Sequence, residues 1–465
     1  MSKKKILLLS DDLRMSSGVA TMSAEIVRNT IHKFDWVQVG GAIDHPEKNK
    51  EIDLGDAVLK DWKLSLGEDG IKPYLKLYPT SGYGNQQLIR NLIDKESPDA
   101  IMIYTDPRFW VWLFQMEHEL RMHIPMFYYN IWDDLPYPMW NQSYYDSVDA
   151  LFNISKQTVN IVKNVRSSYE PWQVTYIPHG INEEVFYPID KTHVEYPKVE
   201  NFKKKFNKDV DFIVFYNNRN IRRKLPGDVI LAFKTFCDKL SKEEANKCAL
   251  LMHTQPVDKN GTDLPAVKEA VAPDCNIYFS DKRLDQKEMN LLYNMCDITL
   301  NMASNEGFGL GTAESLMCGK PIIVNVTGGM QDQCGFKYKG KHLTADDYDW
   351  VHSLHDRNKW MNNPDLTYGD WVKPIWPNNR SLQGSPPTPY IFDDRCGFEE
   401  AAGQIYEWYK TPKEDRDKLG LKGREWMLTE EIGMSAKHMG DRFINDIETV
   451  FENWKPRERF EVFKA

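Results

Sequence analysis

The chain has 465 residues, 41% of them hydrophobic and 27% charged, with a formal net charge of −9. Its length fits about two to three domains, and its composition is that of a soluble globular protein rather than a disordered chain or a uniformly basic nucleic-acid binder. No run of about 18 apolar residues occurs, so the sequence predicts neither a transmembrane helix nor stable insertion into a membrane.

The N-terminus begins with three lysines and a short apolar run that ends at Asp11 and Asp12. The run is too short for a signal peptide, so we interpret Lys5–Ser10 as a first buried strand. All seven cysteines lie at or after Cys237, without a C-x-x-C pair or the spacing of a zinc site. This pattern predicts a reducing, cytoplasmic compartment.

The first part of the chain alternates apolar, strand-like runs with helical stretches, as in a parallel α/β sheet. A glycine turn at Ser17–Val19 separates the first strand from a helix predicted from about Ala20 to His32. The further strands that we predict here are Trp36–Gly40, Ala100–Tyr104, Met126–Asn130, Ala150–Ile154 and Val174–Ile177.

A polar, lysine-rich stretch from about Lys191 to Asp209 is interpreted as a linker, after which a second series of the same kind begins. The predicted strands are Phe212–Tyr216, Ala249–His253, Asn276–Phe279, Ile298–Met302 and Pro321–Val326, and the predicted helices are Asp228–Leu240, Gln286–Cys296 and Thr312–Met317. We therefore expect two doubly wound, Rossmann-like domains, at residues 1–195 and 209–430, facing each other across a cleft that holds the active site.

Residues from about 344 to 394 interrupt this rhythm and are predicted to form an insertion. A loop of this length is usually functional or mobile. Its tryptophans either stack on a sugar or base, or pack the insertion onto its own domain; they are Trp350, Trp360, Trp371 and Trp376. Residues 431–465 are predicted to form a C-terminal helix that returns to the first domain.

The most informative stretch runs from Asn305 to Pro321 and contains two carboxylates, Glu306 and Glu314, with a glycine-rich turn between them. A strand precedes this turn and a helix follows it. A helix N-terminus presents backbone N–H groups and a positive dipole to an anion. Two carboxylates that flank such a site suit a ligand with a central phosphate and hydroxyls at both ends, which is the shape of a nucleotide sugar.

A basic turn, Arg219–Lys224, follows the strand at Phe212–Tyr216. Arg219 supplies a planar fork and Lys224 a point charge, so the pair is suited to a pyrophosphate. A solvated basic turn is the alternative. Because the glycine and carboxylate motif is predicted to lie on the same sheet, we favour phosphate binding.

These motifs together resemble those of retaining, nucleotide-sugar-dependent glycosyltransferases of the GT-B fold. The family is the large group 1, or family four, which includes glycogen-synthase-like and sucrose-synthase-like enzymes. The residues that carry the resemblance are Arg219 to Lys224, Asp285 to Asp297, Ser304 to Gly329, Ser17 to Ala20 and Ile177 to Phe186. The first domain also looks like that of phage-encoded members.

The resemblance assigns roles around the motif. It implies that Glu314 binds the ribose hydroxyls and that Glu306 contacts the donor sugar. The backbone N–H groups of Phe308, Gly309 and Leu310 would lie beside the sugar and phosphate. The donor would be a nucleoside-diphosphate sugar, with a UDP-sugar favoured.

For the leaving diphosphate, the resemblance implies neutralisation by Arg219 and Lys224. Gly18 would let the backbone of the first domain approach the same group, and the base would rest near Arg283. Members of the family use these cations in place of a metal, so we expect no metal and no further cofactor.

The chain departs from the family in one respect, because the histidine that many members carry at a strand end of the first domain is missing. Asp106 stands at the comparable position and is our candidate for a polar group near the reacting carbon; the alternative is a helix cap. His179 is interpreted as structural rather than catalytic.

The sequence therefore predicts a retaining hexosyl- or pentosyltransferase that acts on a hydroxyl acceptor of unknown identity. A different hypothesis is a DNA glycosyltransferase whose acceptor is a hydroxymethylated base of phage DNA, working in the host cytoplasm, which would require a basic cleft and a flipped base. Two further hypotheses are a catalytically silent nucleotide-sugar-binding protein and a GT-B epimerase.

Overall fold

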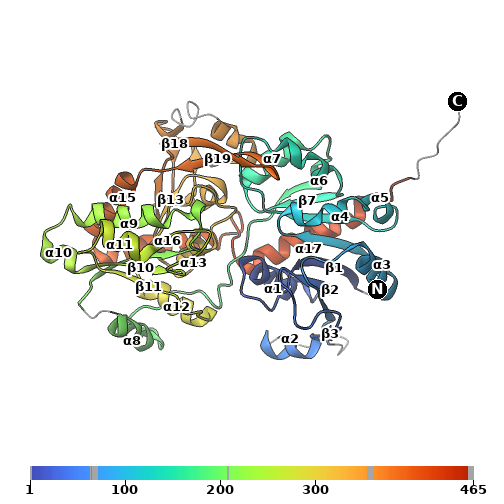
Figure 1. The fold of residues 1–465 in the computed structure, drawn as a ribbon, viewed down its shortest axis with the longest axis horizontal. Coiled ribbons are helices and arrows are strands. Elements are labelled where there is room, and N and C mark those ends of the chain that lie inside the picture. The colour runs from blue at the N-terminus through green and yellow to red at the C-terminus, as the bar shows by residue number, and fades with distance from the viewer. Residues whose placement is uncertain (1–2, 63, 65–71, 207–208, 353–359, 459–465) are drawn as a thin grey trace. The chain divides into compact units, whose positions relative to one another are not determined.

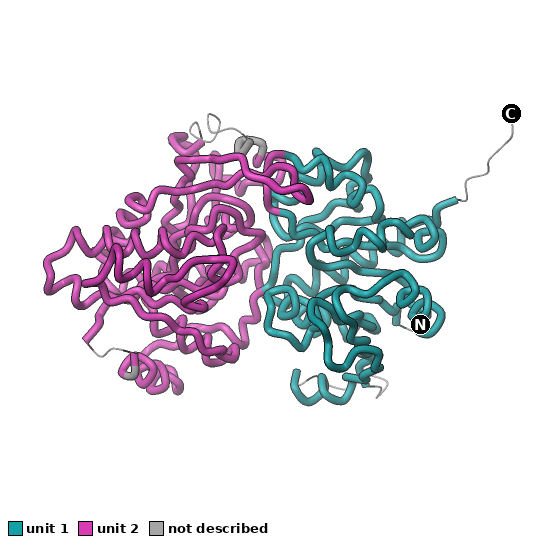
Figure 2. Tube along the Cα trace, viewed as in Figure 1, with its two compact units in different colours: residues 1–132, 137–180, 436–465 teal, residues 133–136, 181–435 magenta. Residues whose placement is uncertain are grey.

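The computed structural model describes residues 3–62, 64, 72–206, 209–352 and 360–458. Two compact units divide the chain (Figure 2): the first comprises residues 1–132, 137–180 and 436–465, and the second comprises residues 133–136 and 181–435. The N-terminal part of the first unit thus ends at Gly180, whereas the sequence predicted a boundary near residue 195. Residues 436–465 also belong to this unit.

An eight-stranded sheet forms the centre of the first unit, with the order β3-β4-β2-β1-β5-β6-β7-β8 (Figure 1). Every pairing is parallel except that of β3 with β4. The strands are β1 Lys4–Asp11, β2 Phe34–Gly41, β3 Ile52–Asp53, β4 Leu75–Pro79, β5 Ala100–Tyr104, β6 Met126–Asn130, β7 Ala150–Asn153 and β8 Val174–Tyr176. The apolar run of β1 is fully buried, which confirms the predicted first strand.

The helices of the first unit are α1 Gly18–Thr30, α2 Gly55–Asp61, α3 Gln86–Glu96, α4 Val111–Phe114, α5 Glu117–Leu120, α6 Gln142–Asp146, α7 Lys156–Val165 and α17 Ala436–Asn453. Short 3₁₀ turns lie at η1 Pro107–Trp110, η2 Met139–Asn141 and η3 Pro171–Gln173. The final helix, α17, packs against α1 within this unit: Lys33, just after α1, forms an ion pair of 2.6 Å with Glu448.

A six-stranded sheet, β11-β10-β9-β12-β13-β17, forms the centre of the second unit, and all its pairings are parallel. Its strands are β9 Phe212–Asn217, β10 Cys248–His253, β11 Ile277–Ser280, β12 Ile298–Asn301, β13 Ile322–Asn325 and β17 Val372–Ile375. The core beneath them is apolar and aromatic, from Phe212 on β9 to Trp408. The two sheets confirm the predicted α/β class with two doubly wound domains.

The helices of the second unit are α8 Tyr196–Phe206, α9 Pro226–Cys237, α10 Lys242–Asn246, α11 Leu264–Val271, α12 Gln286–Met295, α13 Leu310–Met317, α15 Phe398–Lys410 and α16 Lys413–Met427. Its 3₁₀ turns are η4 Arg222–Lys224, η5 Gly328–Cys334 and η6 Ala345–His352. Small strands complete it: β14 Lys337–Tyr338, β15 Lys341–His342, β16 Leu366–Thr367, β18 Asn379–Ser385 and β19 Thr388–Arg395.

The stretch interpreted as a linker from Lys191 to Asp209 contains the helix α8. That interpretation was wrong because the lysine-rich composition hides an apolar face. Val199 on this face is 6% exposed. The rings of Phe206 and Tyr278 meet edge to face, with 4.5 Å between their centroids. Burial of these side chains stabilises a helix that composition alone does not indicate.

The insertion predicted at about residues 344–394 is more regular than expected. Its strand β17 joins the edge of the main sheet beside β13, and β18 and β19 form an antiparallel hairpin. The rings of Trp371 and Trp426 are tilted against each other with 4.8 Å between their centroids, and Trp371 Nε1 donates a hydrogen bond of 3.0 Å to Gln333 O. Trp371 and Trp376 are each 8% exposed, so these two pack onto their own unit; the side chain of Trp350 lies outside the described residues.

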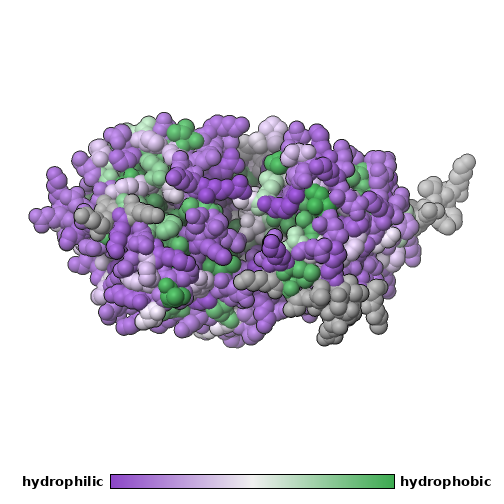
Figure 3. Space-filling view, turned by 90° about the horizontal axis from the view of Figure 1, so that it is seen from below, coloured by the Kyte–Doolittle hydropathy of each residue, from purple (hydrophilic) through white to green (hydrophobic). Residues whose placement is uncertain are grey.

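Hydrophilic side chains cover most of the face seen in Figure 3, and apolar side chains form small separate groups among them. None of the helices in the described residues is long and apolar enough to cross a membrane. The seven cysteines are all free thiols.

Candidate functional site

The glycine-rich turn connects β12 to α13, as the sequence predicts. Gly309 precedes the first residue of α13 with φ of +90°, in the left-handed region that glycine adopts without strain. A Cβ at this position would lie 2.9 Å from Thr312 Oγ1, which donates a hydrogen bond to Gly309 O. The turn is therefore suited to glycine, and it leaves the first-turn N–H groups of α13 at the helix end where an anion is favoured.

Glu306 lies in this turn and contacts Lys224 directly in an ion pair. Lys224 belongs to η4, which follows β9, and β9 is the neighbour of β12 in the sheet. The two side chains, of Lys224 and Glu306, are only 6% and 13% exposed. Loops that follow adjacent parallel strands meet at the carboxyl edge of a sheet, where ligands of such folds bind.

Burial and the neighbouring charges have opposing effects on the Lys224 amine. Burial and the positive charge of Arg223 lower the pKa of Lys224, whereas Asp133 raises it. Direct contact with a carboxylate favours the charged amine, so Glu306 offsets the cost of burying it. A buried cation with one carboxylate partner is a ready site for a second anion.

Glu314 lies on α13 and accepts a hydrogen bond of 2.7 Å from the hydroxyl of Tyr293. Asn217, at the end of β9, donates to the same hydroxyl at 2.7 Å. Burial raises the pKa of Glu314 to about 7, against the hydrogen bond from Tyr293, which lowers it. A carboxylate that titrates near neutral pH and keeps acceptor capacity is able to bind ligand hydroxyls.

The two cations of the basic turn have different partners. Lys224 is buried against Glu306, whereas the side chain of Arg219 is 65% exposed and forms an ion pair of 3.3 Å with Asp258. Their joint action on a pyrophosphate stays a prediction. Arg223, in the same turn, donates from Nη1 to Asn305 O at 2.6 Å and so supports the motif loop.

The Glu306 turn is also held by a second pair of glycines. Gly329 N donates to Glu306 O at 2.9 Å. Gly328 has φ of +52°, and a Cβ there would lie 2.1 Å from the same oxygen. Phe308 is buried at 2% exposure, so any role for it near a ligand falls to its backbone. Leu310 opens α13, and Arg283 is exposed in the loop before α12.

Sequence reasoning missed a polar cluster beside Glu306. Asn305 Nδ2 donates to Asp134 and, at 2.6 Å, to Phe392 O on β19. Burial, with the charges of Asp133 and Asp393, raises the pKa of Asp134 well above its usual range. No local signal in the sequence indicates that Asp134 has a partner 171 residues away.

In the first unit, Gly18 is exposed and opens α1, whose N-cap is Ser17. Asp106 caps η1 by accepting from Arg108 N at 2.9 Å, and it also forms an ion pair with the Arg108 guanidinium. It follows Thr105, whose φ of +141° is unusual for a side-chain-bearing residue and marks this strand end as a constrained position. The capping role is therefore observed, and a role in chemistry stays a prediction.

His179 lies within a tyrosine cluster of the first unit. Its ring contacts the hydroxyls of Tyr129 at 2.7 Å and Tyr104 at 3.3 Å, and burial lowers its pKa to about 3. Such a neutral, enclosed imidazole fits the structural interpretation. Across the described residues, no group of three or more His, Cys, Asp or Glu side chains is arranged to hold a metal ion.

Residues 198–367 match the protein family described as glycosyl transferases group 1. Among curated proteins, the chain is similar to a D-inositol 3-phosphate glycosyltransferase from Stackebrandtia nassauensis. The identity is 26% over 211 residues, which are 44% of this chain and 45% of that relative. The aligned part thus spans less than half of the relative's length.

Solved structures resemble the chain over nearly its whole length. HepE from Anabaena, in complex with UDP and glucose, has a TM-score of 0.62 at 11% identity and covers 96% of this chain and 100% of its own. Sucrose-phosphate synthase from Thermosynechococcus elongatus has a TM-score of 0.63 at 13% identity, covering 97% of this chain and 100% of its own. At these identities the likeness is one of fold, and the fold is GT-B.

The fold is therefore the GT-B fold, and part of its second unit matches the group 1 glycosyltransferase family. The matched residues 198–367 lie within the second unit and make up less than half of the chain. This match supports the family resemblance drawn from the motifs over these residues.

Proposed function

We propose that the protein transfers a sugar from a nucleoside-diphosphate sugar to a hydroxyl acceptor. The observation that carries the proposal is the buried ion pair of Lys224 and Glu306 beside the N-terminus of α13. It combines a cation for a leaving diphosphate with a carboxylate for sugar hydroxyls, at the edge of the sheet where ligands bind.

The donor is proposed to be a UDP-sugar, with its ribose on Glu314. The Tyr293 hydroxyl occupies one oxygen of this carboxylate and orients it, which leaves capacity to accept from ribose hydroxyls. HepE, which shares the fold, has been solved with UDP-glucose. That complex supports the choice of nucleotide.

Transfer is proposed to proceed with retention of configuration. The bond from the anomeric carbon to the diphosphate oxygen breaks while the acceptor oxygen bonds to the same carbon on the same face. The leaving phosphate takes the acceptor proton, so no strong protein base is required. Lys224 and the first-turn amides of α13 stabilise the departing charge, and losing one such group costs on the order of 10²–10³ in rate.

Lys224 and Arg219 are proposed to replace a metal ion at the diphosphate. Donor binding would draw the Lys224 amine from Glu306 toward the phosphate and free the Glu306 carboxylate for the sugar. Arg219, whose side chain is 65% exposed, would move from Asp258 onto the same group.

For the acceptor, a hydroxymethylated base in DNA is the specific alternative to a small hydroxyl compound. The exposed basic side chains of Arg219, Arg222 and Arg283 favour an anionic partner near the donor site, although the net charge of −9 opposes one. Electrophoretic mobility shifts with hydroxymethylated DNA at several salt concentrations, followed by mass analysis after incubation with donor, would distinguish the two acceptors.

The proposal is tested by incubating the protein with a panel of nucleotide sugars and measuring release of the nucleoside diphosphate, including slow hydrolysis without acceptor. Release with a UDP-sugar, abolished in Lys224→Ala and Glu306→Gln, is expected. Calorimetric binding without turnover would point to a silent binding protein, and conversion of the donor without acceptor would point to an epimerase. The anomeric configuration of the product, read by NMR, decides between retention and inversion.

A further inference from the structure

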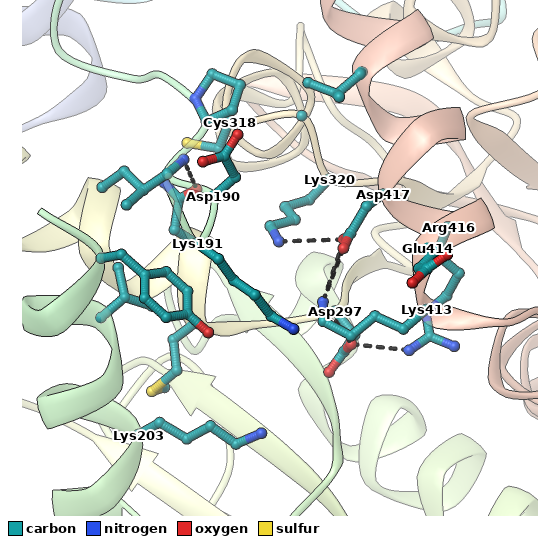
Figure 4. Close-up of a pocket in the computed structure, with 18 of the residues that line it drawn as sticks. Asp190, Lys191, Lys203, Asp297, Cys318, Lys320, Lys413, Glu414, Arg416 and Asp417 are labelled. Carbon is teal, nitrogen blue, oxygen red and sulfur yellow. Dashed lines mark hydrogen bonds and ion pairs between the residues drawn. The ribbon is translucent and has the colours of Figure 1, made fainter. Parts of the chain in front are cut away.

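The second unit holds a cavity of about 880 Å³ that is separate from the donor site (Figure 4). Asp211, Asp297 and Lys320, which line it, come just before β9, β12 and β13. The cavity therefore lies at the amino edge of the sheet, whereas Lys224 and Glu306 follow the carboxyl ends of β9 and β12. The six residues of β9 separate the two edges by about 20 Å, at roughly 3.3 Å per residue.

Lysine amines converge on this cavity from three different segments. In Figure 4, Lys191, Lys203 and Lys320 point toward the same space, from the chain before α8, from α8 itself and from the turn before β13. Lys203 and Lys320 both lie close enough to Cys296 to lower the pKa of its thiol, which burial raises. Their positive charges therefore act on one small region.

Lys320 is the most buried of these amines, with only 9% of the residue exposed. Its ion pair with Asp417 is 3.7 Å long, beyond hydrogen-bond distance. Burial and the charge of Lys413 lower the pKa of Lys320. A buried amine held so loosely gains from a closer anion.

The carboxylates around the cavity leave room for such an anion. Asp297 accepts from Arg416 Nη2 and from Ile213 N, both at 2.9 Å, so its charge is already matched. Asp417 is bound by Lys413 at 3.1 Å. The other acidic side chains that line the cavity are solvent-exposed: Asp190, Glu200, Asp211 and Glu414.

Apolar side chains line the cavity next to the lysines. Val199, Phe212 and Met295 are 6%, 2% and 7% exposed, and they form a surface on which an apolar or ring-shaped group fits. A volume near 880 Å³ is within the range of ligand sites, which is roughly 300–1,000 Å³. The cavity thus combines the amines of Lys203 and Lys320 with an apolar wall.

We propose that this cavity binds a small organic phosphate, with the phosphate on Lys320 and Lys203 and the organic part against Val199, Phe212 and Met295. Lysines act as point charges for a phosphate, which offers several acceptor oxygens to converging amines. This proposal does not depend on the proposed transferase activity, because the donor site lies at the other edge of the sheet.

Phenyl phosphate and inorganic phosphate are the probes, measured by calorimetry in the full chain with Lys224→Met and Glu306→Gln, which weakens phosphate binding at the donor site without leaving an unpaired buried charge. We expect saturable binding at one site, with phenyl phosphate tighter than inorganic phosphate. In that background, Lys320→Gln should weaken phenyl phosphate at least tenfold and Lys203→Gln several-fold. The matched control is Lys418→Gln, an exposed lysine of α16 that does not line the cavity and should leave the affinity unchanged.

Absence of saturable binding, or equal affinities in the Lys203→Gln, Lys320→Gln and Lys418→Gln chains, would overturn the proposal. If Lys320→Gln fails to fold, Lys203→Gln alone decides, because Lys203 lies on the surface helix α8. Equal affinity for the two probes overturns the assignment of the apolar wall. Each result stands whether or not the protein releases nucleoside diphosphate from a donor.

Discussion

Lys224 and Glu306 form a buried ion pair between two loops that follow adjacent strands of the second sheet, although 82 residues separate them in the chain. Each side chain would be an unmatched buried charge without the other. The same two residues therefore contribute both to the stability of the second unit and to the reaction proposed for it.

Removing one partner of this pair should destabilise the second unit more than removing both. Lys224→Met leaves Glu306 buried without its cation, a change that costs about 3 to 5 kcal/mol in other buried pairs. The double variant Lys224→Met, Glu306→Gln should recover part of this loss. Urea unfolding followed by tryptophan fluorescence measures it, and additive effects of the two substitutions would argue against a coupled pair.

Binding of the nucleoside should weaken as pH falls through about 7. The pKa of Glu314 is raised to about 7, so below that pH the carboxyl is protonated and accepts less well from ribose hydroxyls. Uridine is the probe, because it has no phosphate that titrates in this range. We expect about tenfold weaker binding at pH 6 than at pH 8, if only the ionised form binds. Glu314→Gln should give a flat profile, and an unchanged slope in that variant would exclude Glu314 as the titrating group.

The free energy of unfolding should fall as pH rises because of Asp134, whereas nucleoside binding is expected to strengthen as pH rises. A carboxyl whose folded-state pKa is raised contributes stability that is complete below its unfolded pKa and lost as pH rises through the folded pKa. Asp134→Asn keeps an acceptor for Asn305 but carries no charge. The variant should therefore unfold at a temperature a few degrees higher than the parent at pH 8, with no such gain at pH 4. Equal melting shifts at both pH values would count against a buried, raised carboxyl.

Gly328→Ala should disturb the Glu306 loop. Its Cβ would stand 2.1 Å from Glu306 O in a backbone with φ of +52°, so either the loop or the glycine turn must move. Gly340→Ala is the matched control, because Gly340 has φ of +80° but open space around its Cβ. Both should lose about 1 kcal/mol from backbone strain. Only Gly328→Ala should also lower donor turnover, by at least tenfold; equal turnover in the two variants would contradict the loop's role.

Chelation of metals should leave the proposed reaction unaffected. Lys224 and Arg219 are proposed to supply the positive charge that a divalent ion supplies in other transferases. Release of nucleoside diphosphate in excess EDTA should equal that in magnesium buffer to within about twofold. Loss of release in EDTA, restored by one added metal, would overturn the proposal that these two cations replace a metal.

Much of the fold was predictable because its signals are local. The strands Ala100–Tyr104 and Met126–Asn130 were predicted with the bounds that the structure has, since each is a short apolar run bounded by polar residues. The helix α8 was not, because lysines dominate its composition and its apolar face is recognisable only from its partners. Strand β17 was missed since a proline within it, Pro374, suppresses the strand signal at what proves to be a sheet edge.

The sequence by itself determined the class of the sheets, the glycine turn and the residue types of the donor motif, because backbone conformation and hydrophobic period act over a few neighbouring residues. Only the tertiary structure decided which charges meet. In it, Lys224 forms an ion pair with Glu306 and Arg219 forms one with Asp258. Asn305 donates a hydrogen bond to Asp134, 171 residues away in the chain. Such pairings depend on strand order and burial, which bring distant segments together at one edge of a sheet and remove the water that would otherwise separate their charges.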